Sequence, residues 1–354
     1  MTPAILFICG SLNQTTQMHQ IAKQMEDHQC YFTPFYADGS EDFAARHGWL
    51  NTTILGGRHR QETQAYLAEH KLPVDERGER HSYDLVVTCT DLIVPKNIRR
   101  KRLVLVQEGI TMPEGLMYHL VRNVKVLPRY LADTAATGLS DYYDLFCVAS
   151  EGYRELFIRK GVRPDKIAVT GIPNFDSLNT NIENPFPQRG YVLVATSPIR
   201  EALCAEDRPA FLKRCVQIAN GRPLIFKLHP LERAERARRE IARIAPEAQV
   251  LTHGNVNHMI ANAEVVITQK STCTFVALAL DKQVYSQMNL DELRRLMPLQ
   301  NRGESSHRIA SLCHRILHTP MPVLDALRLA YRYRSKSITG SKSQPKSRWE
   351  IPNP

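Results

Sequence analysis

The segment TQKST (268–272) displays hydroxyl, amide and ammonium groups between an apolar run and the apolar pattern CTFVALAL (273–280). The run before it reads as a buried strand, and the pattern after it has helical spacing. Ser271 or Thr272 could cap that helix, because a hydroxyl accepts a hydrogen bond from an amide that the first turn leaves unpaired. The same amides could instead bind a phosphate, since they form the positive end of the helix dipole. This segment by itself leaves both interpretations open.

Three further polar clusters also follow apolar runs: TSPIR (196–200), KLHP (227–230) and THGNVNH (252–258). Taken singly, their prolines could merely end strands and their histidines could be ordinary loop residues. In open parallel sheets, however, ligands bind beyond the carboxyl ends of the strands, and all four clusters would meet there. Cations and hydroxyls with almost no acid predict a bound anion. The predicted phosphate or nucleotide ligands are Thr196, Ser197, Lys227, His229, Lys270, Ser271 and Thr272.

These clusters require a fold in which strands and helices alternate, and the chain has that pattern. Strands are expected at 4–9, 84–89, 102–107, 144–149 and 166–171, and again at 191–196, 223–228, 249–252, 263–268 and 282–286. Helices are expected at 15–26 behind a threonine cap, at 150–162 between Ser150 and Gly161, and at 232–245. Strands separated by helices predict an α/β protein with two Rossmann-like, doubly wound parallel sheets.

The length of 354 residues exceeds that of one ordinary domain. The stretch NTNIENPFPQRG (179–190) loses its periodicity and gathers Asn, Pro and Gly, which is typical of a linker. We therefore expect four parts. They are an N-terminal acceptor-side domain over 1–180, a linker over 181–190, a nucleotide-binding domain over 191–325, and a basic, flexible tail over 326–354.

The first domain offers its own polar groups after two strands. Glu108 follows the run RLVLVQ and could deprotonate a hydroxyl group of a substrate, or it could be a solvated loop residue. The loop ICGSLNQTT (8–16) could bind a sugar or be an ordinary turn. Its candidate acceptor-binding residues are Gly10, Ser11, Asn13 and Gln14. The loop lacks GxGxxG spacing, which argues against a nicotinamide cofactor.

Charge and cysteine content narrow the class of protein. The formal charge is +10, and residues 328–349 carry seven Lys or Arg without one acid. This tail could lie on an anionic membrane surface or be solvated and disordered; no nucleic-acid-binding motif accompanies it, so we expect no nucleic-acid partner. The eight cysteines include no CxxC pair and predict reduced thiols and no metal site. With no secretory leader, we expect a cytoplasmic protein, with the inner face of the cytoplasmic membrane as a candidate location.

Two stretches resemble a known group of enzymes. FKLHP (226–230), followed by NVNHMIANAEVVITQKSTCTFVALALDKQVYS (255–286), resembles the C-terminal half of GT-B-fold enzymes. Those most similar are CDP-glycerol glycerophosphotransferase-like proteins and UDP-N-acetylglucosamine 2-epimerases. SEGYRELFIRKGVRPDKIAVTGIPNFDSL (150–178) looks like the end of their first domain, where a TG-x-P-x-x-D turn follows a strand. The resemblance covers about residues 144–286 and implies two domains facing a cleft.

The resemblance implies that Lys227 and His229 contact a phosphate or the transferred group, and that Ser271 and Thr272 bind a pyrophosphate. It implies a transferase that moves a sugar or glycerol-phosphate unit from a nucleotide-activated donor to a glycan or lipid-linked acceptor, without a further cofactor. A nucleotide-sugar 2-epimerase or hydrolase, or a non-catalytic nucleotide-binding subunit, remain as alternatives. The chain departs from the epimerases in having no carboxylate in CTFVALAL, and from the transferases in having Gln269 and Lys270 where an Asp is usual.

Overall fold

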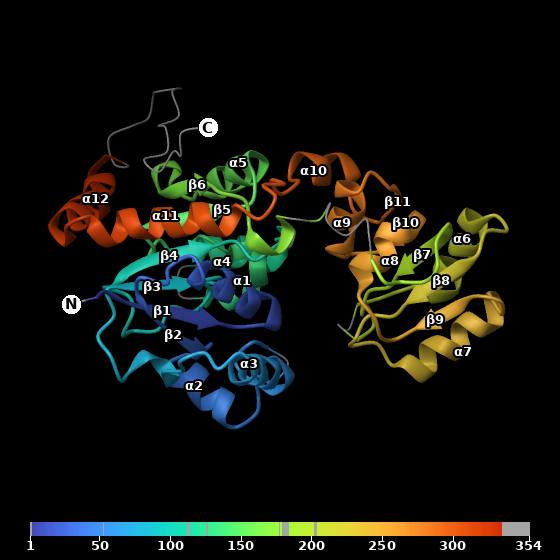
Figure 1. Cartoon of the computed structure of the whole chain (residues 1–354), viewed down its shortest axis with the longest axis horizontal. Coiled ribbons are helices and arrows are strands. Elements are labelled where there is room, and N and C mark those ends of the chain that lie inside the picture. The colour runs from blue at the N-terminus through green and yellow to red at the C-terminus, as the bar shows by residue number, and fades with distance from the viewer. Residues whose placement is uncertain are drawn as a thin grey trace. The chain divides into compact units, whose positions relative to one another are not determined.

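The structure, a computed structural model, describes residues 2–51, 53–111, 114–124, 127–176, 178, 184–201 and 204–334. The chain forms two compact units (Figure 1). Unit 1 comprises Met1–Asp176 with Asn301–Pro354, and unit 2 comprises Ser177–Gln300. The chain therefore returns to unit 1 after unit 2, whereas the sequence analysis assigned 191–325 to one domain. None of the helices in the described ranges has the length and apolar character needed to cross a membrane.

Unit 1 is built on a six-stranded parallel sheet with the order β2-β1-β3-β4-β5-β6. The strands are β1 (Ala4–Cys9), β2 (Gln29–Pro34), β3 (Leu85–Thr88), β4 (Arg102–Val106), β5 (Leu145–Val148) and β6 (Ile167–Val169). The chain builds outward from β1 to β2 and then continues with β3 on the other side of β1. This reversal is a topological switch point, and in such sheets ligands bind beyond the carboxyl ends of the strands that flank it.

The helices of unit 1 are α1 (Leu12–Ala22), α2 (Gly39–Arg46), α3 (Gly57–Glu69), α4 (Leu116–Asn123), α5 (Glu151–Lys160), α11 (Ser305–His318) and α12 (Met321–Arg334). As predicted, Ser150 caps α5, and Gly161 ends it with a positive φ of 105°. The expectation for 15–26 was wrong at its start. Helix α1 begins directly after β1, because the Ser11 hydroxyl accepts a hydrogen bond from the Gln14 amide at 3.2 Å and caps the helix.

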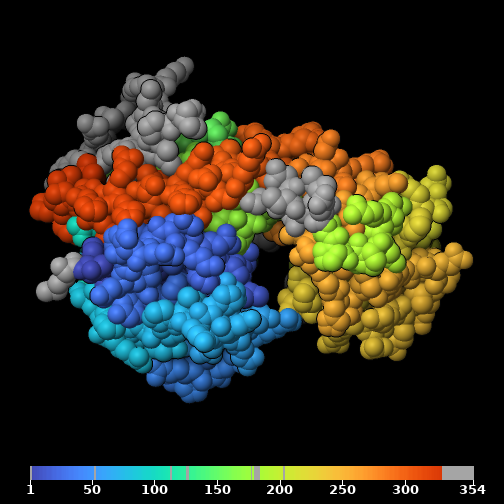
Figure 2. All heavy atoms as spheres, viewed as in Figure 1, coloured from blue at the N-terminus to red at the C-terminus, as the bar shows by residue number. Residues whose placement is uncertain are grey.

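Helix α11 is attached to unit 1 by the TG-x-P-x-x-D turn. The Asp176 carboxylate accepts hydrogen bonds from the amides of Asn301 at 2.7 Å and Ser305 at 2.6 Å, at the start of α11. The Ser305 hydroxyl donates to the Thr170 carbonyl at 3.0 Å, across Gly171, whose φ is 75°. Figure 2 shows α11, in orange, lying against the blue N-terminal part of the unit. The turn thus fastens the returning chain to the edge of the first sheet.

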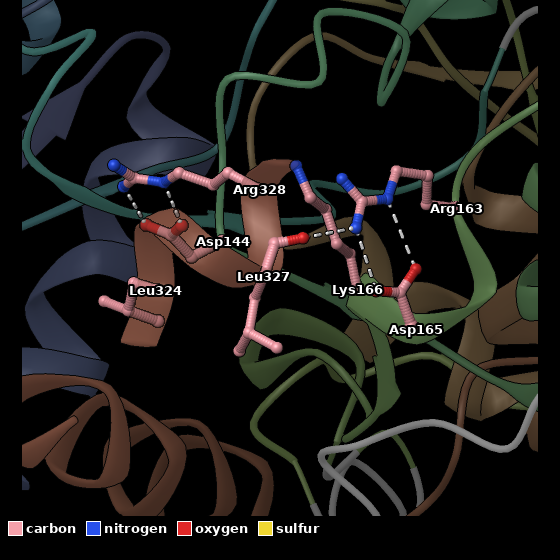
Figure 3. A pocket seen from close by; sticks show the side chains of 7 residues that line it. All are labelled: Asp144, Arg163, Asp165, Lys166, Leu324, Leu327 and Arg328. Atoms are coloured by element: carbon pink, nitrogen blue, oxygen red, sulfur yellow. Dashed lines mark hydrogen bonds and ion pairs between the residues drawn. The ribbon is translucent and has the colours of Figure 1, made fainter. Parts of the chain in front are cut away.

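Helix α12 is fastened at the amino ends of β4 and β5 (Figure 3). Arg328 donates two hydrogen bonds of 2.8 Å to Asp144, which directly precedes β5, and one of 3.1 Å to the Lys101 carbonyl. Arg163 pairs with Asp165 at 3.0 Å and donates to the Leu327 carbonyl at 3.2 Å. Residues 326–334, assigned from the sequence to a basic tail, therefore lie in a docked helix; residues 335–354 lie outside the described ranges.

Unit 2 has a five-stranded parallel sheet with the order β11-β10-β7-β8-β9. Its strands are β7 (Tyr191–Ala195), β8 (Leu224–Lys227), β9 (Gln249–Leu251), β10 (Ala263–Thr268) and β11 (Gln283–Tyr285). Its helices are α6 (Arg208–Ala219), α7 (Ala234–Ile244), α8 (Val256–Asn262), α9 (Cys273–Ala279) and α10 (Leu290–Arg295). Apolar side chains of α6 and α7 pack with those of β7, β8 and β10 in one buried cluster. Of the predicted linker, residues 181–183 lie outside the described ranges, and 184–190 form no helix or strand.

Candidate functional site

The predicted phosphate ligands of unit 2 lie along one edge of its sheet. The chain builds β7, β8 and β9 toward one side and then places β10 on the other side of β7, so the switch point lies between β7 and β10. Thr196 and Ser197 directly follow β7, and the segment 269–272, here called the QKST segment, directly follows β10. Sequence reasoning placed these residues together, and the topology puts them at the position where open α/β sheets bind ligands.

Hydrogen bonds join the two strand ends. The Ser197 hydroxyl donates to the Lys270 carbonyl at 3.0 Å, and the Ser197 amide donates to Gln269 Oε1 at 3.4 Å. The Thr196 hydroxyl donates to Glu232 and accepts from the His229 amide at 3.1 Å. Both predicted hydroxyls are buried and engaged within the protein. The hydrogen bonds of the two hydroxyl groups hold the turns together and do not point toward a ligand.

Lys227 ends β8 with its ammonium group held at the same edge of the sheet. Nζ donates to the carbonyls of Leu228 at 3.1 Å and Thr252 at 3.0 Å. Burial lowers the pKa of the lysine from its ordinary value. A lysine ammonium has three N–H donors, so the two bonds leave one for an anion.

His229 opens the HP turn, the name used here for residues 229–232. The ring nitrogen Nδ1 accepts a hydrogen bond from the Leu231 amide at 3.2 Å. Because Nδ1 is the acceptor, a neutral ring carries its proton on Nε2. The half-buried side chain can therefore act as a hydrogen-bond donor through Nε2.

Ser271 acts as a capping residue at the start of α9. Its hydroxyl accepts a hydrogen bond from the Cys273 amide at 3.2 Å, at the start of α9, as a capping residue would. The Thr272 side chain makes no capping bond, and Thr272 and Lys270 are exposed. Ser271 therefore caps the helix, as one interpretation predicted. Lys270 and Thr272 are accessible to a ligand at the same edge of the sheet.

Sequence reasoning missed the charged residues beneath these turns. The site was expected to hold almost no acid, but Glu206 and Glu232 lie under it with buried side chains, paired with the buried Arg208. Glu232 follows Pro230 by two residues, so its place in the HP turn offered a signal. Glu206 precedes α6 and Arg208 is its first residue, far along the chain from both turns, and nothing in their local pattern connects them to the site.

The candidate residues of unit 1 converge on one carboxylate. Glu108 accepts hydrogen bonds from the Ser11 hydroxyl at 2.9 Å, from Asn13 Nδ2 at 3.4 Å and from Gln14 Nε2 at 2.6 Å. All three donors belong to the start of α1, where the helix dipole also favours a negative charge. Glu108 is therefore not a solvated loop residue: it is half-buried and held in place.

Gly10 allows this arrangement. A Cβ atom at Gly10 would lie 2.0 Å from Gln14 Oε1, so only glycine leaves room for the Gln14 side chain. Gln14 Oε1 is buried and has no hydrogen-bond partner among the described residues. A carboxylate can accept about four hydrogen bonds, so Glu108 retains the capacity to accept one from a hydroxyl group.

In the part of the chain that the structure describes, no three His, Cys, Asp or Glu side chains are grouped so as to hold a metal ion. All eight cysteines are free thiols, and five of them are buried.

Comparison with known proteins shows the fold. No protein family matches the chain, and no curated protein sequence matches it. Among solved structures, the S. aureus MnaA–UDP co-structure is 12% identical with a TM-score of 0.54, covering 98% of this chain and 100% of that one. UDP-GlcNAc 2-epimerase from Neisseria meningitidis bound to UDP-GlcNAc is 11% identical with a TM-score of 0.54, covering 88% and 100%. The wall teichoic acid polymerase TagF is 12% identical with a TM-score of 0.48, covering 89% of each chain.

The two likenesses with a TM-score of 0.54 confirm the expected fold. The chain is an α/β protein with two parallel sheets, each flanked by helices, as expected. At such low identity, the likeness gives the fold and leaves the reaction open.

Proposed function

We propose that the protein is an enzyme that binds a nucleotide-activated donor on unit 2 and transfers a sugar or glycerol-phosphate unit to a glycan or lipid-linked acceptor bound on unit 1. The observation that supports the donor site most is the gathering of Lys227, His229 and the QKST segment at the switch point of the unit 2 sheet. A use in making cell-surface polysaccharide and a location at the inner face of the cytoplasmic membrane belong to the same proposal.

The donor phosphates would meet Lys270, Ser271 and Thr272 on one side and Lys227 with His229 on the other. During transfer, the bond between the moving group and the nucleotide phosphate breaks, and negative charge grows on that phosphate. The Lys227 ammonium stabilises this charge, and His229 donates a hydrogen bond from Nε2 to the departing oxygen. Thr196 and Ser197 support the two turns from below.

The acceptor would place its hydroxyl group at Glu108. The hydroxyl oxygen forms the new bond to the transferred group while its proton passes to Glu108, which has capacity for one more hydrogen bond. Ser11, Asn13 and Gln14 hold that carboxylate in place and would contact the acceptor's other hydroxyls, and Gly10 leaves room for the Gln14 side chain.

An epimerase or hydrolase of nucleotide sugars is the second candidate, favoured by the likeness to a UDP-GlcNAc 2-epimerase and to a structure with bound UDP. Helix α9 has no carboxylate to bind a ribose, which disfavours it. Such an enzyme would consume the donor alone, whereas a transferase needs an acceptor. Turnover of UDP-GlcNAc without any acceptor would decide for the second candidate. A non-catalytic subunit would bind nucleotide with no turnover at all.

The donor site is tested by thermal shift and calorimetric titration with UDP, CDP, GDP and CMP. A ligand at ~100 times its dissociation constant adds about 2.7 kcal/mol to the free energy of unfolding, a shift of a few degrees. We expect a selective shift that Lys270→Ala and Ser271→Ala weaken and that Lys213→Ala, an exposed lysine on α6, leaves unchanged. The absence of any shift in the unmodified protein would reject the donor site.

A further inference from the structure

Beneath the HP turn and the QKST segment, one guanidinium group bridges two carboxylates. Arg208 lies 3.3 Å from Glu206 through Nη1 and 3.2 Å from Glu232 through Nη2. The three side chains are only 2%, 4% and 3% exposed, respectively. They are thus removed from water and cannot themselves touch a ligand that arrives from solvent.

Each carboxylate holds one of the two turns. Glu232 accepts hydrogen bonds from the Thr196 hydroxyl and, at 3.0 Å, from the His229 amide, which fixes the HP turn. Glu206 accepts from Gln269 Nε2 at 2.6 Å, and this bond sets the direction in which the Gln269 amide points. Gln269 Oε1 then accepts a hydrogen bond from the Ser197 amide, and Gln269 is the first residue of the QKST segment.

This arrangement is a poor way to stabilise a fold. Buried ion pairs lose most of their attraction to the cost of leaving water, and apolar side chains of similar size are often as stabilising. Among the described residues, Nε and Nη2 of Arg208 also lack a hydrogen bond, despite the close approach of Glu232. Unit 2 already has an apolar cluster between its sheet and α6 and α7. Stability therefore does not account for the triad.

We propose that Arg208, Glu206 and Glu232 are positioning residues that hold the HP turn and the QKST segment at the separation a nucleotide phosphate requires. This inference rests on the proposed function, and it adds three residues that make no contact with the ligand. The triad determines where His229 and Lys270 stand, through Thr196 and Gln269.

The experiment replaces the whole triad by apolar side chains of similar size, in Glu206→Met/Arg208→Met/Glu232→Met. Arg200 keeps Glu240 as its partner, but the Gln269 side chain and the His229 amide lose their acceptors, so we expect the melting temperature to change by a few degrees at most. We expect the affinity for the nucleotide that unmodified protein binds best to fall by about tenfold or more, the loss typical when residues that orient binding groups are removed. Glu232→Gln retains an oxygen acceptor for Thr196 and His229. It should therefore bind the nucleotide more tightly than Glu232→Met does.

The matched control is Arg222→Met/Glu264→Met, which removes a half-exposed pair of the same unit at 3.9 Å and should leave the nucleotide affinity unchanged. A triad variant that binds nucleotide as well as the unmodified protein would overturn the inference. Amide hydrogen exchange without ligand separates it from the proposed function: faster exchange at His229 and over 269–272 in the triad variant supports positioning even if no nucleotide binds. Unchanged exchange at both turns would refute it.

Discussion

At the scale of single residues, Gly10 has the most sharply defined role. Gly10→Ala would put a methyl group 2.0 Å from Gln14 Oε1 and force the side chain to release Glu108. We expect a loss of about 1–3 kcal/mol in the free energy of unfolding, as for other overpacked sites. Denaturant titration measures it. Gly115→Ala is the control, because nothing lies within 4 Å of its Cβ position; equal losses in both variants would contradict the clash.

His19 gives a prediction about pH. Burial, and then the nearby charges of Lys23 and His70, lower its pKa from the ordinary 6.5 to about 4. The unfolded chain therefore takes up a proton as pH falls from 6.5 toward 4, while the folded protein does not, and stability is lost over that window. We expect His19→Gln to lose less stability than the unmodified protein between pH 7 and about pH 5. Denaturant titrations at both values, with the exposed His119→Gln as control, test this; parallel losses in all three proteins would refute it.

Sequence reasoning found the residues that follow strands and missed those that do not. Glu108 and Ser11 both follow predicted strands, so the parallel sheet brings them to one edge although they are far apart in sequence. Glu206 meets Gln269 across 63 positions from a loop without strand or helix periodicity. Such pairs depend on tertiary packing, which local patterns do not encode.

At the scale of elements, the attachment of α11 depends on Gly171. A Cβ atom there would lie 2.2 Å from Ser305 Oγ, and its φ of 75° is strained for any other residue. We expect Gly171→Ala to cost about 2–5 kcal/mol, from the left-handed backbone and the clash together. Gly161→Ala has a positive φ with open space around it and should cost only about 1–2 kcal/mol. Thermal denaturation compares the two; a loss at Gly171 no larger than at Gly161 would contradict the contact.

Most of the strands could be predicted because buried parallel strands are continuous apolar runs. All ten predicted strands are present, with ends that differ by at most two residues. Strand β2 was missed because QCYFTP lacks such a run, and it gains its place by pairing with β1 at the end of the sheet. The start of α1 was missed because two threonines looked like a cap, while the hydroxyl that caps the helix is that of Ser11.

At the scale of the whole molecule, the sequence predicted two α/β domains but not the return of the chain to unit 1. No helix was predicted for α11 or α12, and residues 326–334 of α12 were assigned to a flexible tail. Their polar partners include Asp176 for α11 and Asp144 for α12, which stand far away in sequence.

We propose that the C-terminal segment 335–354 binds an anionic membrane surface. They include Lys336, Lys342, Lys346 and Arg348, and each such charge adds about 1 kcal/mol near an anionic surface. We expect deletion of 335–354 to lower partition to anionic vesicles by tenfold or more, about 1.4 kcal/mol, at unchanged melting temperature. Neutral vesicles provide the control, and undiminished partition of the shortened protein would reject this role.

The return of the chain also has a consequence for biosynthesis. Unit 2 is one continuous segment inserted into unit 1, whose helix α11 is encoded after residue 300. All of unit 2 therefore emerges from the ribosome before α11 and α12 do. Unit 2 can fold its core before α11 and α12 are available to unit 1. Unit 1, whose synthesis begins first, therefore completes its folding last.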